Sequence, residues 1–382
     1  MKINILPLVS KLHEKGRIDV ETRNLLNDLE NHSEHKFNIT DIEDFYDSDM
    51  SLILVQSGGS EGLFLEQFNN LKPPFYLLTY GHNNSLAASI EILSYINDNN
   101  LPGEILHGDV NYILKRIEQL SNQIRLGVIG KPSDWLIASN VDYKDALKLH
   151  NINLIDIDIE EVINGYNQAN DAALEDFDFD KNEIKKALKL HNTLVKIKEK
   201  YNLDGLTIRC FSLLDTIGTT ACLSLAKLNS MGIIGTCEGD IPTMISMQIL
   251  QKLTSMSGFQ ANPSRINVSD NTMVLAHCTL PFNMCEDYKL DTHFESGIGV
   301  AIKGELNCEK VTIFKISRNL KNYFVTTGTI LRNLSESNLC RTQIEIKVDR
   351  DIEYFLTHPY GNHHVIVYGD WVDEINEYFK KC

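Results

Sequence analysis

Short apolar runs alternate with helix-spaced segments along the first part of the chain. Mostly apolar runs occupy positions 2–8, 51–56 and 75–79, and stretches with helical spacing of apolar residues follow them. A further strand near 104–107 and a helix over 109–120 continue the alternation. Strands that alternate with helices predict a parallel sheet with helices on both faces, so we expect an α/β domain over residues 1–122.

The same alternation starts again near residue 125 and predicts a second α/β domain over residues 123–258. Both domains should be doubly wound, of the Rossmann or flavodoxin type, with any site outside the carboxyl ends of the strands. The expected strands are 126–130, 153–157, 205–210 and 233–236, and the expected helices are 159–172, 182–201, 218–228 and 244–256.

The pattern changes near residue 259. Short strands follow one another without a helical pattern between them, which predicts a β-rich, barrel-like or sandwich domain over residues 259–382. The expected strands include 299–303, 310–316, 323–331, 343–348 and 364–368, and a short helix over 371–379 closes the chain.

The stretch from 233 to 278 carries the strongest chemical signal. Its first strand ends at Cys237-Glu238-Gly239-Asp240, which places two carboxylates where a strand stops and a helix begins. Asp240 is a reasonable cap for that helix, with Pro242 in the first turn. Asp240 is therefore interpreted either as a cap or as a ligand or neighbour of a site at Glu238.

Two strands, 264–268 and 272–278, follow that helix and form an expected hairpin. A turn centred near Asp270 would place His277 opposite Pro263 and beside Asn262. Glu238, Asn262 and His277 would then converge, and such a set suits a divalent cation such as Mn²⁺ or Mg²⁺. The alternative is that Glu238 only precedes a capped helix and His277 only ends a strand.

Composition narrows the classes of partner. The formal net charge of −16 argues against binding to nucleic acid or to an anionic membrane surface. No apolar run is long enough to span a bilayer, and the first residues do not form a signal peptide. The eight cysteines all lie from Cys210 onward without a CxxC pair, which favours free thiols in a reducing cytoplasm.

The segment from Glu238 to His277 resembles the active-site segment of the L-fucose and L-arabinose isomerases. In that family a Glu-Gly-Asp-type turn leads into a helix, a Phe-x-x-acid segment follows, and then a strand ends in His. This chain has Glu238-Gly239-Asp240, then Phe259 to Asn262, and then a strand that ends at His277. Asn262 stands where the family has its second acid.

A second match to the family lies late in the chain. The family's last metal ligand is a His in a Gly-x-His-His type of loop just before a strand, and residues 361–364 read Gly-Asn-His-His. Adjacent strand residues point to opposite faces, so only one of the pair can reach a site. We favour His364 as the ligand, with His363 near the substrate; a histidine pair without this loop would more often be ordinary surface.

The resemblance implies a metal-dependent aldose–ketose isomerase that works through an enediol intermediate. It implies Mn²⁺, or Mg²⁺ or Co²⁺, held by Glu238, His277, His364 and Asn262. Glu238 would also act as acid/base, with Asp240 or Glu295 as a second acid. The resemblance further implies a homo-oligomer, a trimer or hexamer, in which the N-terminal domain closes over a neighbouring subunit's site. His82 and Asn83 are the expected contribution of that domain.

Two residues near expected strand ends are candidates for contact with a sugar. Trp135 follows a strand end and would stack on a sugar or simply pack. Arg209 ends the strand beside that of Glu238 and would hold an anionic group or pair with a carboxylate.

Two other functions compete with a plain sugar isomerase. One is a non-catalytic sugar-binding or regulatory protein on the same fold, which the neutral Asn262 favours because an amide cannot take a proton. The other is an isomerase of a phosphorylated or sulfonated sugar.

Overall fold

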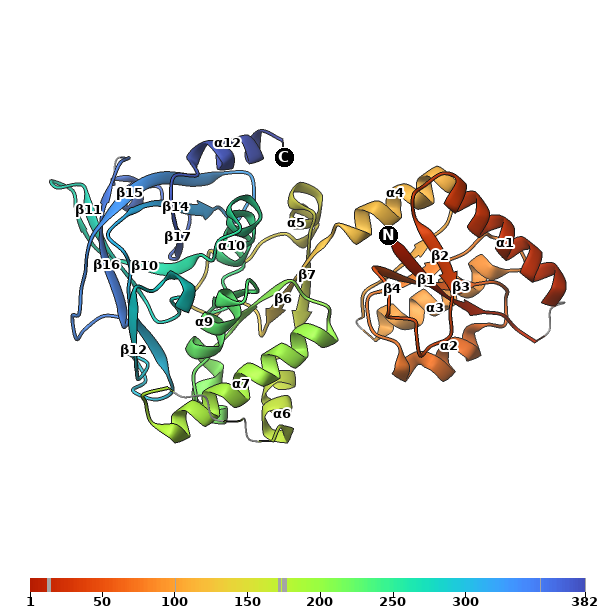
Figure 1. Ribbon diagram of the computed structural model, residues 1–382, viewed down its shortest axis with the longest axis horizontal. Helices are drawn as coiled ribbons and strands as arrows, with labels where there is room; N and C mark the ends of the chain where they lie inside the picture. The colour runs from red at the N-terminus through yellow and green to blue at the C-terminus, as the bar shows by residue number, and fades with distance from the viewer. Residues whose placement is uncertain (12–14, 100, 171–172, 174–176, 351, 382) are drawn as a thin grey trace. The chain divides into compact units, whose positions relative to one another are not determined.

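A computed structural model describes residues 1–11, 15–99, 101–170, 173, 177–350 and 352–381 (Figure 1). The chain forms two compact units, Met1–Gln123 and Ile124–Cys382. The second unit holds both the second expected α/β domain and the β-rich region. Among the described residues, no helix is both long and apolar enough to cross a membrane.

The first unit is built on a five-stranded parallel sheet with the strand order β2-β1-β3-β4-β5. This order is that of flavodoxin-like doubly wound sheets. The elements are β1 (Lys2–Leu8), α1 (Lys15–Asn31), β2 (Lys36–Ile39), β3 (Met50–Val55), α2 (Glu61–Gln67), the 3-10 turn η1 (Phe68–Asn70), β4 (Phe75–Leu78), α3 (Ser85–Asp98), β5 (Gly103–Leu106) and α4 (Val110–Ser121).

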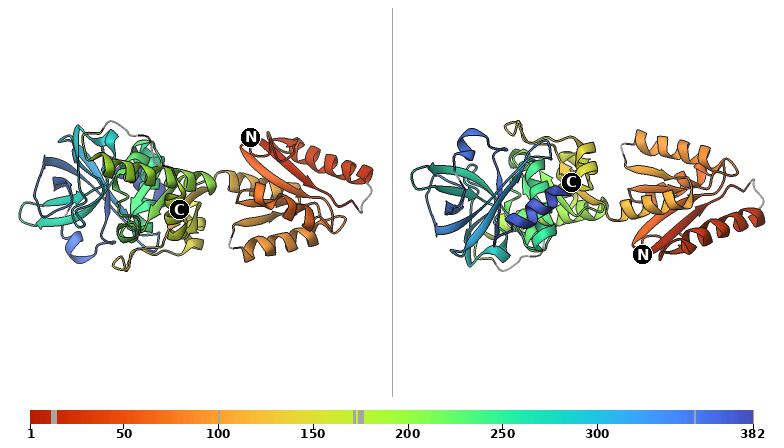
Figure 2. Two further views of the ribbon diagram at one scale, coloured as in Figure 1. Left: turned by 90° about the horizontal axis from the view of Figure 1, so that it is seen from below. Right: turned by 90° about the horizontal axis from the view of Figure 1, so that it is seen from above.

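Helices cover both faces of this sheet (Figure 2). Leu29 of α1 and Ile117 of α4 belong to one apolar cluster with the strands, and Phe64 of α2 and Ile92 of α3 belong to another. The alternation of strands and helices therefore predicted this layering, although strand β2 was not expected.

The second unit begins with a four-stranded parallel sheet of order β7-β6-β8-β9. Helices α5 and α8 were not expected, and α9 begins later than the predicted helix 218–228. The elements are β6 (Ile124–Ile129), α5 (Tyr143–His150), β7 (Ile152–Ile157), α6 (Ile159–Gln168), α7 (Lys181–Lys200), β8 (Gly205–Ile208), α8 (Ser212–Ile217), α9 (Cys222–Ser230), β9 (Ile234–Cys237) and α10 (Ile241–Thr254).

Helix α10 lies between this sheet and the strands that follow it in the chain (Figure 1). All its residues from Ile241 to Leu250 are buried, as its nearly continuous apolar sequence predicts. Met244 belongs to one apolar cluster with Val128 of the sheet and with Phe314 and Val365 of the following strands. The helix that begins at the Glu238 turn is therefore fixed from two sides.

The remaining residues form a closed six-stranded antiparallel barrel, with the strand order β10-β11-β16-β15-β14-β17. The expected β-rich region is thus a barrel. The elements are β10 (Phe259–Asn267), β11 (Thr272–His277), η2 (Phe282–Met284), the paired β12 (Asp287–Asp291) and β13 (Ala301–Glu305), β14 (Lys310–Ile316), β15 (Tyr323–Asn333), β16 (Thr342–Val348), α11 (Tyr354–Thr357), β17 (His364–Tyr368) and α12 (Val372–Lys380).

The register of the hairpin β10–β11 differs from the predicted one. Leu275, not His277, lies opposite Pro263, and Asn262 lies opposite Ala276. The shift arises because the turn is longer than expected and because a β-bulge between Pro263 and Arg265 takes up one further residue. His277 pairs instead with Thr342 on the other neighbouring strand.

Candidate functional site

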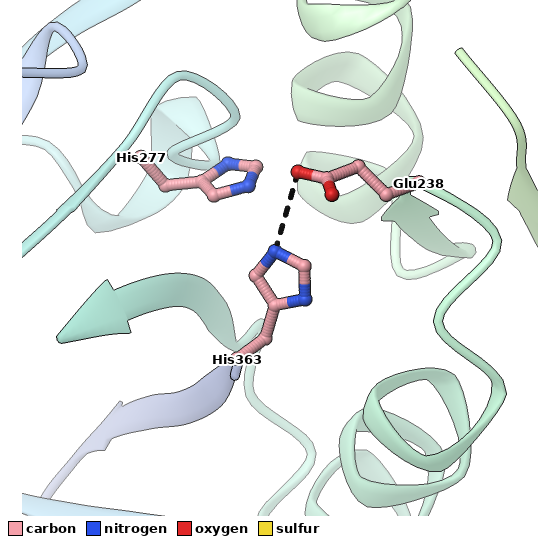
Figure 3. A group of neighbouring side chains, drawn as sticks. All are labelled: Glu238, His277 and His363. Atoms are coloured by element: carbon pink, nitrogen blue, oxygen red, sulfur yellow. Dashed lines mark ion pairs between the residues drawn. The ribbon is translucent and has the colours of Figure 1, made fainter. Parts of the chain in front are cut away.

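Three side chains from separate parts of the second unit converge at one end of the barrel. Glu238 follows β9, His277 ends β11, and His363 precedes β17. Each offers an oxygen or nitrogen atom, and these atoms lie within 4.8 Å of one another (Figure 3). From the sequence, Glu238 and His277 were expected as ligands, and His363 was expected near the substrate.

A tight turn presents Glu238 at the end of β9. Glu238 and Gly239 both have left-handed backbones, with φ values of 63° and 72°. The Asp240 N–H donates to the Cys237 carbonyl at 3.3 Å and closes the turn. A Cβ on Gly239 would lie 2.3 Å from the Lys131 carbonyl oxygen, so only glycine fits between the turn and the neighbouring loop.

We expect Gly239→Ala to lower the free energy of unfolding and to displace Glu238. Alanine must adopt a left-handed backbone, at about 1–3 kcal/mol, and its Cβ also collides with the Lys131 backbone. Gly297→Ala is the matched control, since Gly297 has a similar φ of 68° with nothing within 4 Å of an added Cβ. Chemical denaturation measures both; equal losses in the two variants would mean that the contact with Lys131 is unimportant.

The carboxylate of Glu238 is held by two neighbours. Its Oε2 accepts a hydrogen bond from Trp135 Nε1 at 2.7 Å, and its Oε1 lies 3.4 Å from His363 Nε2. Burial opposes ionisation, but the contacts with His363 and Trp135 outweigh it and lower the pKa of Glu238 to about 2. Glu238 is therefore an ionised carboxylate with a fixed orientation at neutral pH.

His363 is fully buried between two carboxylates. Its Nδ1 donates to Asp240 Oδ2 at 2.8 Å, while its Nε2 has no hydrogen-bond partner although Glu238 is near. Burial disfavours the imidazolium, but Asp240 and Glu238 outweigh burial and raise the pKa of His363 to about 9. Asp240 thus orients the ring so that Nε2 faces Glu238.

His277 is a buried, neutral imidazole beside this pair. Its Nδ1 lies 3.0 Å from Thr279 Oγ1, and its ring centroid lies 5.3 Å from that of His363. Burial and the nearby charge of His363 lower the pKa of His277 to about 4. The ring faces the Glu238 carboxylate in Figure 3.

Asp240 caps helix α10 and supports His363 from behind. Its Oδ1 accepts from the Thr243 N–H at 3.0 Å, and Lys315 Nζ lies 3.3 Å and 3.2 Å from the two carboxylate oxygens. Asp240 and Lys315 are both buried, and Lys315 also donates to Thr243 Oγ1 at 2.6 Å. Burial disfavours the charge of Asp240, but the contacts with Lys315 and His363 outweigh the effect of burial and hold the pKa of Asp240 far below its usual range.

This arrangement fits a divalent cation. Two imidazoles and one carboxylate form a donor set that Mn²⁺ accepts in proteins. His363 Nε2 is a buried nitrogen without a hydrogen-bond partner, and the other ring nitrogen donates to a carboxylate, as metal-binding histidines usually do. Glu238, His277 and His363 are therefore the residues that would hold the ion.

His364 does not take the position that we expected for it. Neighbouring residues of an extended chain face opposite ways, and here His363 faces Glu238. The His364 ring packs against Phe324 and Phe355, and its Nε2 lies 3.1 Å from the Tyr354 hydroxyl. The family's loop identified the histidine pair but not which member turns toward the site.

Two other expected site residues lie outside the group of three. Glu295 is exposed in the loop between β12 and β13. Asn262 is half-buried on β10 opposite Ala276, and the bulged hairpin does not place it opposite His277. Their roles as second acid and as ligand stay predictions.

The candidates for sugar contact are placed differently from one another. Trp135 is 54% exposed and touches Glu238 directly through its indole N–H. Arg209 donates to the Pro132 carbonyl and pairs with the exposed Asp134. Of the two roles expected for Arg209, the structure therefore shows the pairing with a carboxylate. His82 and Asn83 belong to the first unit, where Asn83 donates to Glu21 at 2.7 Å; their part in a site stays a prediction.

Lys315 was not expected from the sequence. It is buried in strand β14, which reads KVTIFKI and is exposed only at Lys310. A lysine within such an apolar run is a usable signal, because a buried ammonium requires a buried carboxylate as its partner.

Comparison with known proteins finds distant relatives. The sulfoquinovose isomerase of Priestia megaterium is 25% identical over 288 residues, which cover 69% of this chain and 64% of the relative. The sulfoquinovose isomerase of Clostridium sp. (strain MSTE9) is 26% identical over 188 residues, covering 45% and 41%. No protein-family model matches the chain.

The chain spans a little under two thirds of the length of the Priestia relative. A third sulfoquinovose isomerase, from Alkalicoccus urumqiensis, is 24% identical over 186 residues. These distant homologues are named as isomerases of a sugar, which supports the resemblance that the Glu238 segment indicated.

Proposed function

We propose that this protein is a metal-dependent aldose–ketose isomerase. The observation that carries the proposal is the convergence of Glu238, His277 and His363, with His363 Nε2 3.4 Å from the Glu238 carboxylate. The distant similarity to sulfoquinovose isomerases supports the reaction class.

The chain's own residues would bind the sugar and move a proton. A bound divalent cation supplies Lewis-acid stabilisation of negative charge on sugar oxygens. Glu238 is ionised and oriented by Trp135, so it is prepared to carry a proton between C1 and C2 of an open-chain sugar. The exposed face of Trp135 lies next to that carboxylate and is suited to cover a sugar ring or chain.

Glu295 is the better candidate for a second acid. Asp240 is fully buried, and its carboxylate oxygens accept hydrogen bonds from Lys315, His363 and Thr243, so it is poorly placed to exchange a proton with substrate. Glu295, in contrast, is exposed in the loop between β12 and β13.

We expect Glu295→Gln to lower kcat by about 10²-fold, the usual size of one acid–base contribution, with Mn²⁺ affinity unchanged. Affinity should be unchanged because Glu295 lies outside the group of three. Steady-state kinetics and calorimetric Mn²⁺ titration measure the two quantities. An unchanged kcat would leave Glu238 as the sole acid–base group.

A sulfonated sugar is the substrate class that we propose. The relatives' name denotes such a sugar. Arg209 at the end of β8 is next to the Glu238 turn, since the Gly239 N–H donates to the Ile208 carbonyl. Its partner Asp134 is exposed, so a substrate sulfonate would compete with that carboxylate for the guanidinium.

Purified protein should be incubated with Mn²⁺ and a panel of neutral, phosphorylated and sulfonated aldoses, and ketose formation assayed. We expect turnover, highest with a sulfonated aldose. Stabilisation by a sugar without turnover would support the alternative of a sugar-binding or regulatory protein. No Mn²⁺ uptake and no change in any sugar would contradict the proposal.

Mn²⁺ affinity is expected to rise about tenfold per pH unit between about pH 7 and pH 9, since binding at His363 Nε2 releases a proton. The folding stability of the metal-free protein should show the opposite trend and fall as the pH rises. Its His363 pKa is raised from 6.5 to about 9, so the stabilisation by imidazolium is complete below 6.5 and is lost as the pH rises through 9. Calorimetry and thermal unfolding across this range test both trends; a flat affinity would exclude His363 as a ligand.

We also propose, from the resemblance, that the protein is a cytoplasmic homo-oligomer in which His82 and Asn83 reach a neighbouring subunit's site. Light scattering measures the assembly, and a trimer or hexamer is expected. A monomer with full activity would contradict this part of the proposal without affecting the metal site.

A further inference from the structure

Thiols gather directly behind the candidate metal site. Five of the seven cysteines that the structure describes belong to this group of thiols, and four of the five are buried. Cys237 directly precedes Glu238 in the chain, and Cys278 directly follows His277. Cys222 and Cys278 share a small apolar cluster against which Cys340 packs. The five are Cys210, Cys222, Cys237, Cys278 and Cys340.

One pair of these thiols is nearly in bonding position. The sulfur of Cys210 lies 2.9 Å from that of Cys237. Cys237 ends β9, and Cys210 follows β8, the strand paired with β9. The Cys210 N–H donates to the Ile208 carbonyl at 2.8 Å, so the chain bends after β8 and brings this thiol over the neighbouring strand.

We propose that Cys210 and Cys237 form a reversible disulfide under peroxide and that this disulfide impairs the Glu238 site. The effect on activity rests on the proposed function, whereas the disulfide itself does not. Nothing in the reaction of an aldose–ketose isomerase uses these thiols, so their placement beside the site is a separate feature.

A small cavity lies beside Cys210, on the side of the pair away from Cys237. Cys210 lines this cavity together with Phe211, Leu214, Cys222 and His293. Hydrogen peroxide is close to water in size. Entry from this side meets Cys210 first, because Cys237 does not line the cavity.

The chemistry balances with hydrogen peroxide as the oxidant. Cys210 loses its proton and the resulting thiolate attacks one peroxide oxygen; the O–O bond breaks, a sulfenic acid forms, and the leaving hydroxide takes up the proton as water. The Cys237 thiol then attacks the sulfenic sulfur, the S–S bond forms, and a second water leaves. Two thiols lose two protons and two electrons in total, and the two peroxide oxygens gain them. An external dithiol such as dithiothreitol reverses the change by exchange.

The disulfide would act on Glu238 through the chain. A sulfur–sulfur bond is about 2.05 Å long, so the two sulfurs must approach by about 0.9 Å. Cys237 is bonded through its N–H to Gln260 at 2.8 Å, and Gly239 fits without space against Lys131. Because Gly239 has no room to move against Lys131, a shift of the Cys237 backbone toward Cys210 would be taken up at Glu238, which lies between them. A misplacement of about 1 Å costs about 10²-fold in rate.

The test treats Mn²⁺-loaded protein with hydrogen peroxide, with and without later dithiothreitol. We expect a mass loss of two hydrogens, a peptide linking Cys210 to Cys237, and a 10- to 100-fold fall in activity and in Mn²⁺ affinity, on the order that such a shift gives, all restored by dithiothreitol. Cys210→Ala should keep basal activity and resist peroxide. Cys308→Ser, which removes an exposed thiol, should behave as the wild type.

Several outcomes would overturn the proposal. A different pairing, such as Cys222 with Cys278, would do so, and so would a Cys210–Cys237 disulfide that leaves Mn²⁺ affinity and activity unchanged. Mapping of the oxidised wild type decides the pairing even if Cys210→Ala fails to fold.

Failure of the proposed function gives a different result. A reduced protein that isomerises no sugar, but forms the disulfide and then loses Mn²⁺, keeps the thiol proposal and rejects the activity. If Mn²⁺ does not bind at all, the fluorescence of Trp135 in a Trp371→Phe background still reports movement of Glu238, because the indole bonds to that carboxylate. No change in this signal on oxidation would reject the thiol proposal.

Discussion

Replacement of Glu238 by glutamine is expected to lower kcat by about 10³-fold and to weaken Mn²⁺ binding. The amide keeps the shape of the side chain but cannot accept the transferred proton. It also removes the negative charge among the three groups that would hold the ion. Steady-state kinetics and calorimetric Mn²⁺ titration measure the two losses.

Glu286→Gln is the matched control, because Glu286 is exposed in the same unit and its substitution removes the same negative charge. It should leave both quantities at the wild-type level. A Glu238→Gln variant with turnover near that of the wild type would remove Glu238 from the mechanism and the proposed function with it.

Replacement of Lys315 by methionine is expected to lower the free energy of unfolding by about 3 kcal/mol. Lys315 and Asp240 are both almost fully buried, with side-chain exposures of 1% and 0%. Methionine fills much of the same space but leaves the Asp240 charge with only Thr243 and His363 as donors. Denaturant unfolding, followed by a probe in residues 124–382, measures the loss.

The double variant Lys315→Met, Asp240→Asn should recover part of this loss. Asparagine still caps α10 and no longer buries an unpaired charge. Lys310→Met, which breaks the exposed pair with Asp370, should change stability little. A Lys315→Met loss no larger than that of Lys310→Met would show that the buried pair is not important for folding.

Local sequence predicted the elements that depend on local chemistry. The alternation of apolar strands and helices gave both parallel sheets, and the apolar circumference of α10 indicated its burial on all sides. The turn at Glu238 was readable because it combines a strand end, a glycine and a helix cap within four residues. The barrel followed from short strands without helices between them.

The errors concern contacts between distant segments. The register of β10 and β11 depended on a bulge at Ser264, for which the neighbouring Pro263 was the available signal, because proline within a strand is typical of bulges. The choice between His363 and His364 depended on which side of the strand packs against Phe324 and Phe355 inside the barrel. Both are fixed by the closed barrel as a whole and not by the residues nearby.

Helix α10 has a consequence for how this unit opens in solution. Its first ten residues are covered by the sheet on one side and by the barrel on the other, so neither can separate without exposing it. Amide hydrogens from Met244 to Leu250 should therefore exchange with deuterium only through opening of the whole of residues 124–382. The amides of this helix would then report a single free energy of opening, which the sheet and the barrel share although their architectures differ.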